Sequence, residues 1–182
     1  MRLYHTGFQI IKTPDLTIGR KNADFGPGFY LSDNEEFSRR WAREKSGFTT
    51  YLNSYEFSTD GLNIKNLSRD GEWFDYITSN RFDKPDMFSC FDVIIGPIAN
   101  DTIFETWGLL TSGLVEKKQA LQALNLGPHY TQIVIKTEKA LSSLHFLDAV
   151  EIPSTEIASY KEKLNKEEET FQEEFVKVLN IE

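Results

Sequence analysis

Three short stretches of the sequence hold polar side chains that a simple hydrophobic core does not need. They are residues 4–7 (Tyr-His-Thr-Gly), 21–30 and 128–132. A histidine titrates near neutral pH, which makes the one at this strand end a candidate for chemistry. The glycines and proline before Tyr30 predict a turn that brings main-chain N–H groups close to a ligand, with an aromatic ring as a stacking wall. Gln132 adds an amide to an otherwise apolar run.

Each stretch also has a purely structural explanation. A lone strand-end histidine is usually half-buried and bonded to the main chain. Two glycines and a proline often make only a turn, and a glutamine on a strand can face solvent. Taken one at a time, the three stretches therefore do not identify a function.

Apolar and alternating runs indicate the strands that must carry these groups. The segment 2–5 predicts a buried strand, and 28–32 predicts a second short strand after the glycine-rich turn. The continuous apolar run 90–99 predicts a fully buried strand that ends at Gly96-Pro97. Further strands, the third of them alternating, are expected at 49–58, 62–67, 131–136 and 145–152.

Helical patterns separate these strands. Ser32 and Glu35 predict a capping box for a helix that puts Phe37, Trp41 and the stem of Arg40 on one face. Further helices are expected at 71–82, about 101–126 with Asp101 as its cap, 138–144 and from 155 onward. Because strands and helices do not alternate regularly, the sequence predicts an α+β fold.

Composition narrows the class of protein. The chain has 182 residues, of which 40% are hydrophobic, so it suits one domain with a sizeable core and excludes a disordered chain. Its net charge of -8 disfavours non-specific binding to duplex nucleic acid, which needs clustered cations. Every arginine lies before residue 82, so we expect an anionic ligand to bind the N-terminal half.

Cysteine usage and hydropathy predict a cytoplasmic protein that holds no metal and contacts no membrane. The single cysteine, Cys90, excludes an internal disulfide, and no Cys/His spacing matches a zinc site. The N-terminus lacks the apolar stretch of a signal peptide. No window of about 18 apolar residues is long enough to cross a bilayer.

In their order along the chain, the three stretches resemble the ADP-ribosyltransferase superfamily. The match is to its His-Tyr-Glu branch, which includes diphtheria-toxin-like and poly-ADP-ribose-polymerase-like enzymes. The resemblance covers roughly residues 2–148. Within the superfamily, the sequence more closely resembles a bacterial family of uncharacterised domains. The blocks that carry it are LYHTG, RKNADFGPGFYLS, WARE, FDVIIGPIANDTIF and QIVIKTEKALSSLHF.

This resemblance implies a split β-sandwich of two facing antiparallel sheets with flanking helices, forming an NAD-binding domain over residues 1–153. NAD is the implied co-substrate, held in one cleft on which the side chains of His5, Tyr30 and Gln132 converge as the catalytic set. His5 would bond the adenosine-ribose hydroxyls and Tyr30 would stack on the nicotinamide. The remaining implied NAD-binding positions are Tyr4, Thr6, Gly7, Arg20, Lys21, Phe25, Gly28 and Phe29.

Two pairs of these positions have more specific implied roles. The main chain near Thr6 and Gly7 would hold the nicotinamide carboxamide. Arg20 or Lys21 would pair with the pyrophosphate. We therefore expect mutation of Arg20 to weaken NAD binding more than mutation of Arg69.

The sequence departs from the branch at its third motif position, where Gln132 replaces the usual glutamate. Spacing favours Gln132 over Glu138, because Gln132 lies within the expected strand. An amide accepts a hydrogen bond from the ribose 2'-hydroxyl but carries no charge and takes no proton. Transfer of ADP-ribose, hydrolysis of NAD, and binding without turnover therefore all stay open.

The resemblance favours a mono-ADP-ribosyltransferase, with an NAD glycohydrolase or a catalytically silent regulatory domain as alternatives. The acceptor is unknown, and a protein is favoured over a nucleic acid. Small bacterial domains of this type often resemble the toxin of a toxin–antitoxin pair, which implies an antitoxin partner. The acidic amphipathic helix of residues 154–182 is expected either to pack on the domain or to dock a partner.

Overall fold

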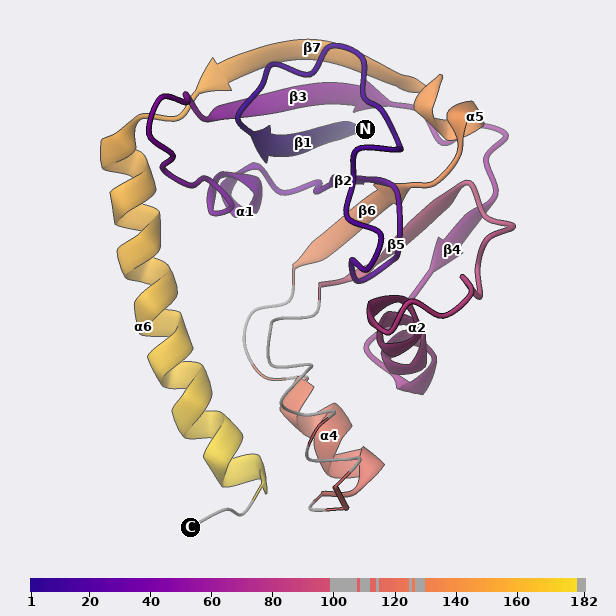
Figure 1. Cartoon of the computed structure of the whole chain (residues 1–182), viewed down its shortest axis with the longest axis vertical. Helices are drawn as coiled ribbons and strands as arrows, with labels where there is room; N and C mark the ends of the chain where they lie inside the picture. The colour runs from indigo at the N-terminus through magenta and orange to yellow at the C-terminus, as the bar shows by residue number, and fades with distance from the viewer. Residues whose placement is uncertain (99–107, 109–111, 114, 125, 127–129, 180–182) are drawn as a thin grey trace.

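The computed structural model of the chain describes residues 1–98, 108, 112–113, 115–124, 126 and 130–179. Its strands form two sheets, one arched over the other (Figure 1). The upper sheet has the order β1-β3-β7, with β1 at Arg2–Gly7, β3 at Tyr51–Phe57 and β7 at Leu144–Glu151. The lower sheet has the order β2-β6-β5-β4, with β2 at Phe29–Leu31, β6 at Thr131–Ile135, β5 at Val93–Pro97 and β4 at Ile64–Asn66. The expected α+β class and all seven expected strands are confirmed.

One strand pair differs from the expected antiparallel arrangement. β4 and β5 run parallel, with Ile64 opposite Val93. A parallel pair needs a crossover, and α2 at Gly71–Arg81 supplies it between the two strands. The expectation of two purely antiparallel sheets was therefore wrong for the lower sheet.

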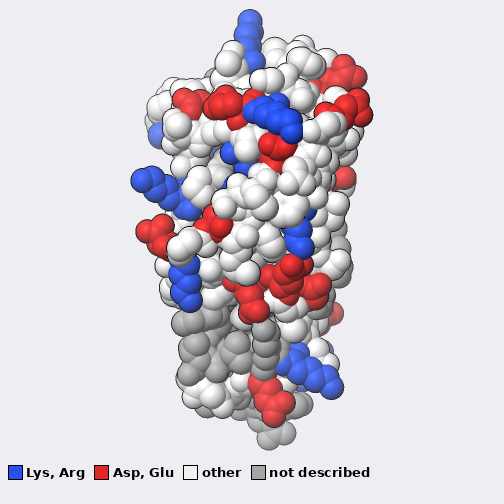
Figure 2. All heavy atoms as spheres, turned by 90° about the vertical axis from the view of Figure 1, so that its right-hand side faces the viewer, with Lys and Arg blue, Asp and Glu red and all other residues white. Residues whose placement is uncertain are grey.

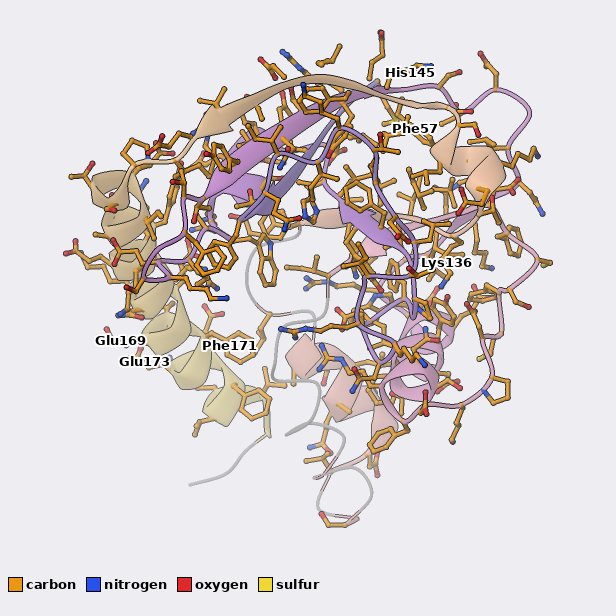
Figure 3. The ribbon with its side chains drawn as sticks, turned by 45° about the horizontal axis from the view of Figure 1, so that its top comes forward. Phe57, Lys136, His145, Glu169, Phe171 and Glu173 are labelled. Carbon is orange, nitrogen blue, oxygen red and sulfur yellow. The ribbon has the colours of Figure 1, made fainter. Side chains whose placement is uncertain are left out.

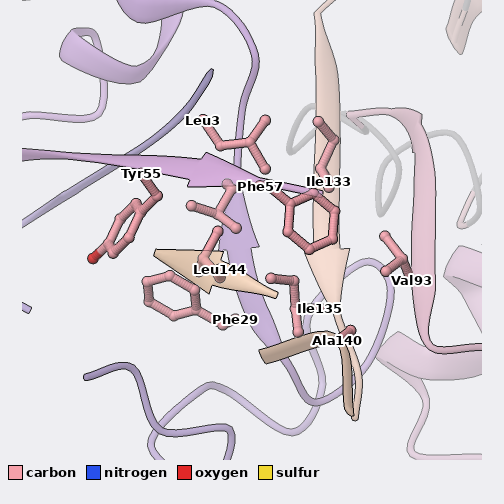
Figure 4. Close-up of a cluster of buried hydrophobic side chains, with 10 residues drawn as sticks. Leu3, Phe29, Tyr55, Phe57, Val93, Ile133, Ile135, Ala140 and Leu144 are labelled. Carbon is pink, nitrogen blue, oxygen red and sulfur yellow. The ribbon is translucent and has the colours of Figure 1, made fainter. Parts of the chain in front are cut away.

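The main core lies between the two sheets. Leu3, Tyr55 and Phe57 of the upper sheet meet the side chains of Phe29, Leu31, Val93, Ile133 and Ile135 of the lower one (Figure 4). A second cluster fills the opposite face of the lower sheet, where Trp73 and Ile77 of α2 cover Ile94 and Val134. Because both faces of β6 are covered, Gln132 to Ile135 are all buried, and the alternation expected there is absent.

The first helix is shorter than predicted and begins differently. α1 spans Glu35–Arg39, and its cap is Asn34, whose side chain accepts from the Phe37 N–H. The Ser32 hydroxyl accepts from the Asn34 N–H instead, so the predicted capping box is wrong. Trp41 lies beyond the end of α1 and is 55% exposed, which removes it from the expected apolar face.

The C-terminal helix packs on its own chain. α6 spans Ser154–Leu179; Ile157 packs near its start with Leu52, and Phe171 and Phe175 pack on α4 (Lys117–Leu124). Figure 3 shows Phe171 on the side of α6 that faces α4, with Glu169 and Glu173 away from it. Of the two uses expected for this helix, the structure therefore shows packing within the chain.

Charged side chains are mixed on the face at the right of Figure 1. Figure 2 shows Lys and Arg interspersed with Asp and Glu there, without a continuous basic area among the described residues.

No described helix is long and apolar enough to cross a membrane. The remaining short helix, α5 at Glu138–Leu141, confirms the turn expected after β6. Asp101 and His129 lie outside the described residues.

Candidate functional site

The three polar stretches meet where the two sheets touch. Tyr4 of β1 and Ser32, just beyond β2, form an isolated antiparallel bridge with N···O distances of 2.9 and 3.0 Å. The Ser32 hydroxyl also donates to the Thr131 carbonyl of β6 at 3.1 Å. Three strands that are far apart in the sequence therefore meet at one point, which we call the strand junction.

His5 is held by its main-chain contact at this junction. Its Nδ1 lies 2.8 Å from the Tyr30 carbonyl oxygen, which only accepts, so Nδ1 carries the proton. The ring stacks on Phe29 with centroids 4.7 Å apart. Burial lowers the pKa of His5, which favours the neutral ring with an accepting Nε2. A Cβ at Gly7 would lie 3.4 Å from Nε2, so the glycine leaves space at that atom.

This geometry predicts a pH-dependent stability that originates at His5. The unfolded histidine titrates near 6.5, whereas burial keeps the folded residue neutral to lower pH. The unfolded chain therefore binds more protons below pH 6.5, and the free energy of unfolding falls as the pH decreases from 7 to 5. We expect His5→Asn, whose amide can replace Nδ1, to show a smaller fall in urea unfolding measurements.

The exposed histidine of β7 provides the control for this measurement. His145→Asn changes an exposed histidine whose side chain makes no hydrogen bond among the described residues, so the pH dependence of this variant should match that of the wild type. Equal pH dependence for His5→Asn and the wild type would contradict the assignment of the effect to His5.

Tyr30 closes the turn that precedes it. Its hydroxyl accepts from the Phe25 N–H at 2.9 Å and donates to the Gly26 carbonyl at 2.7 Å. Burial raises the pKa of Tyr30, so the phenol stays neutral. The Gly26 N–H is bonded to the Ala23 carbonyl at 2.9 Å. These two N–H groups are used inside the turn, which corrects the expectation that they face a ligand.

Gln132, next to Thr131 of the junction, has a buried donor with unused hydrogen-bonding capacity. It is 8% exposed, and within the described part of the chain its Nε2 has no hydrogen-bond partner. A buried unpaired amide costs about 1–3 kcal/mol. The atom itself is covered, so this donor can reach an acceptor atom of a ligand only if the groups that cover it shift. Glu138, the alternative position, is exposed at the start of α5.

Strand alternation separates the side chains of the three residues. Tyr30 packs on the cluster under α2, and Gln132 lies two residues from Val134 on that same face of the lower sheet. The ring of His5 instead lies against Phe29, which faces the upper sheet. The residues are neighbours at one junction, but their side chains do not all converge on one cleft, because the main chain of β2 runs between them.

The other predicted positions have varied surroundings. The Thr6 hydroxyl donates to the Ser38 carbonyl at 2.6 Å, and Tyr4 packs on the cluster that contains Leu52. Phe25 is fully buried under α2, so its ring serves the core rather than a ligand wall. The positions Arg20 and Lys21 are exposed and form no ion pair with a described residue, whereas Gly28 and Phe29 are buried.

The structure adds a cavity that the sequence analysis missed. It has a volume of about 460 Å³ at the end of the lower sheet, and its lining includes Asn66, Arg69, Gly96 and Thr131. Arg69 thus lies on a cavity wall that also contains the residue next to Gln132. In the sequence, the signal that could have drawn attention to Arg69 was its position directly before Asp70, the N-cap of α2. Whether Arg20 outweighs Arg69 stays a prediction.

The described residues hold no group of three His, Cys, Asp or Glu side chains arranged to bind a metal ion. A family model described as "Protein of unknown function (DUF3990)" matches residues 1–146. The matched segment includes His5, Tyr30 and Gln132 and ends before α6. No curated protein matches the sequence.

Proposed function

We propose that this chain, which belongs to the DUF3990 family of proteins of unknown function, is an NAD-dependent mono-ADP-ribosyltransferase with an ADP-ribosyltransferase-like fold. The observation that carries the proposal is the buried, unpaired amide of Gln132 beside the Tyr30 face of the strand junction. The resemblance in the same three stretches supports it. A toxin or effector role, with an antitoxin partner, is part of this proposal.

In this proposal His5, Tyr30 and Gln132 each have a separate task. Neutral His5 uses its accepting Nε2 to bind a hydroxyl of the adenosine ribose. Tyr30, fixed by its two hydrogen bonds to the turn, presents its ring to the nicotinamide. Gln132 bonds the hydroxyls of the other ribose through an amide that is otherwise unpaired. A dinucleotide is long enough to reach groups on both sides of the three-residue strand β2.

The proposed reaction breaks the bond between the ribose C1' and the nicotinamide nitrogen. Nicotinamide takes the bonding electron pair and leaves as a neutral base, so the departure needs no general acid. The acceptor nucleophile then forms the new bond to C1' and loses its proton. Because Gln132 takes no proton, the acceptor must lose it to another base or to water.

A second candidate is an NAD glycohydrolase, in which water is the acceptor. The specific observation in its favour is again Gln132, since an amide provides no base to activate a protein hydroxyl or amine. The two candidates differ in where the ADP-ribose is found after the reaction.

The test is incubation of the purified chain with labelled NAD and a host lysate. We expect label on macromolecules that protease removes, with a loss of about 100-fold in His5→Ala because the adenosine contact is gone. The matched control, His145→Ala, removes an exposed histidine and should keep full activity. Only free ADP-ribose would identify the hydrolase, and intact bound NAD a silent domain. Absence of NAD binding in calorimetry would contradict the proposal.

A further inference from the structure

A buried lysine contacts the turn before Tyr30 from the far end of β6. Lys136 directly follows the strand that carries Gln132, and its side chain is 8% exposed. Figure 3 places it on the side of the molecule away from α6. Lysine is almost never this buried unless it is paired, so its contacts need an explanation.

Those contacts lead to the turn. The Lys136 Nζ donates to the Phe25 carbonyl and lies 2.9 Å from Oδ2 of Asp86. It is also 3.2 Å from the position that a Cβ at Gly26 would occupy, so the glycine makes room for the ammonium group. Burial lowers the pKa of Lys136, and Asp86 opposes that shift.

The same residue that receives the lysine also holds Tyr30. The Phe25 carbonyl accepts from Lys136, while the Phe25 N–H donates to the Tyr30 hydroxyl at 2.9 Å. The Tyr76 hydroxyl of α2 lies 3.2 Å from this carbonyl and 3.1 Å from Oδ1 of Asp86. The main chain of one residue, Phe25, therefore connects the charged pair to the tyrosine hydroxyl.

We propose that Lys136 is a positioning residue that fixes the Tyr30 ring through Phe25. This rests on the proposed function for its effect on NAD, but the hydrogen bonds that carry it are independent of any ligand. The fixed ring costs a ligand less ordering when it stacks. Loss of the ammonium group should therefore loosen the turn and weaken ligand binding while the rest of the core stays closed.

The test compares Lys136→Met with Lys139→Met. Lys139 is also ion-paired, to Asp92, but its side chain is 59% exposed and it bonds the Gly61 carbonyl away from the turn. We expect Lys136→Met to lower the affinity for NAD in calorimetry about tenfold. Amide hydrogen exchange at Phe25 and Gly26 should speed up by a similar factor. Lys139→Met should change neither.

Hydrogen exchange separates the possible outcomes. Equal acceleration at Val134 and Ile94 would indicate global destabilisation and overturn the positioning role. Unchanged exchange at Phe25 and Gly26 would overturn it as well. Lys136→Arg keeps the charge, so its NAD affinity and its amide exchange at Phe25 and Gly26 should both lie within about threefold of the wild-type values. This variant keeps the test decisive even if the methionine variant folds poorly. A wild type that does not bind NAD would contradict the proposed function, whereas the exchange measurement would still decide the role of Lys136.

Discussion

Gln132→Glu is expected to raise the rate of NAD cleavage about 100-fold at pH 7. The carboxylate would lie beside the positive charge that develops on the ribose as nicotinamide leaves, at a position where Gln132 is only 8% exposed. Charge stabilisation of this kind is worth about 3 kcal/mol in a partly dry site, and each 1.4 kcal/mol is tenfold in rate. The measurement is release of nicotinamide under saturating NAD.

Two variants test whether the position of the charge matters. Thr131→Glu places a carboxylate one residue away, on the opposite face of β6, and should leave the rate within about twofold of the wild type. Gln132→Met keeps the volume and removes the amide, so it should weaken NAD binding without raising the rate. Equal rates in Gln132→Glu and the wild type, with both folded and binding NAD, would remove Gln132 from the site.

Gly28→Ala is expected to lower the free energy of unfolding by about 3 kcal/mol. An added Cβ would lie 2.6 Å from the Ile135 carbonyl oxygen and 2.7 Å from Cγ1 of Val134. Both atoms belong to β6, the neighbour of β2 in the lower sheet, so relief of the clash must move β2 away from β6. The loss corresponds to a decrease of roughly 6–12 °C in the melting temperature for a chain of this size.

Gly47→Ala is the matched control for this loss. Gly47 also has a positive φ, of 78°, but a Cβ there would meet nothing within 4 Å. Its cost is therefore only the backbone strain of about 1 kcal/mol. Similar losses in the two variants would mean that close packing against β6 does not set the requirement for glycine at position 28.

The sequence alone predicted most of the individual elements. The buried strand around Val93 and the helix at Gly71–Arg81 were predicted from the sequence. Both elements follow from the pattern of apolar residues within one short segment, which the sequence shows directly. The order of the three polar stretches also pointed to one site, which stays a prediction; the strand junction brings the main chains of these stretches close together but not all three side chains. The start of the first helix was mispredicted, because Ser32 uses its hydroxyl for contacts to Asn34 and Thr131.

The tertiary structure decided what local pattern does not contain. The parallel pairing of β4 with β5 depends on the path of α2, and the burial of both faces of β6 depends on what covers them. The separation of His5 from the other two side chains follows from how β1 meets β2. The contact of Lys136 with Phe25 and the unpaired amide of Gln132 likewise arise from partners supplied or withheld by distant segments. Sequence spacing sets which residues share a strand face, but only packing sets which atoms remain available to a ligand.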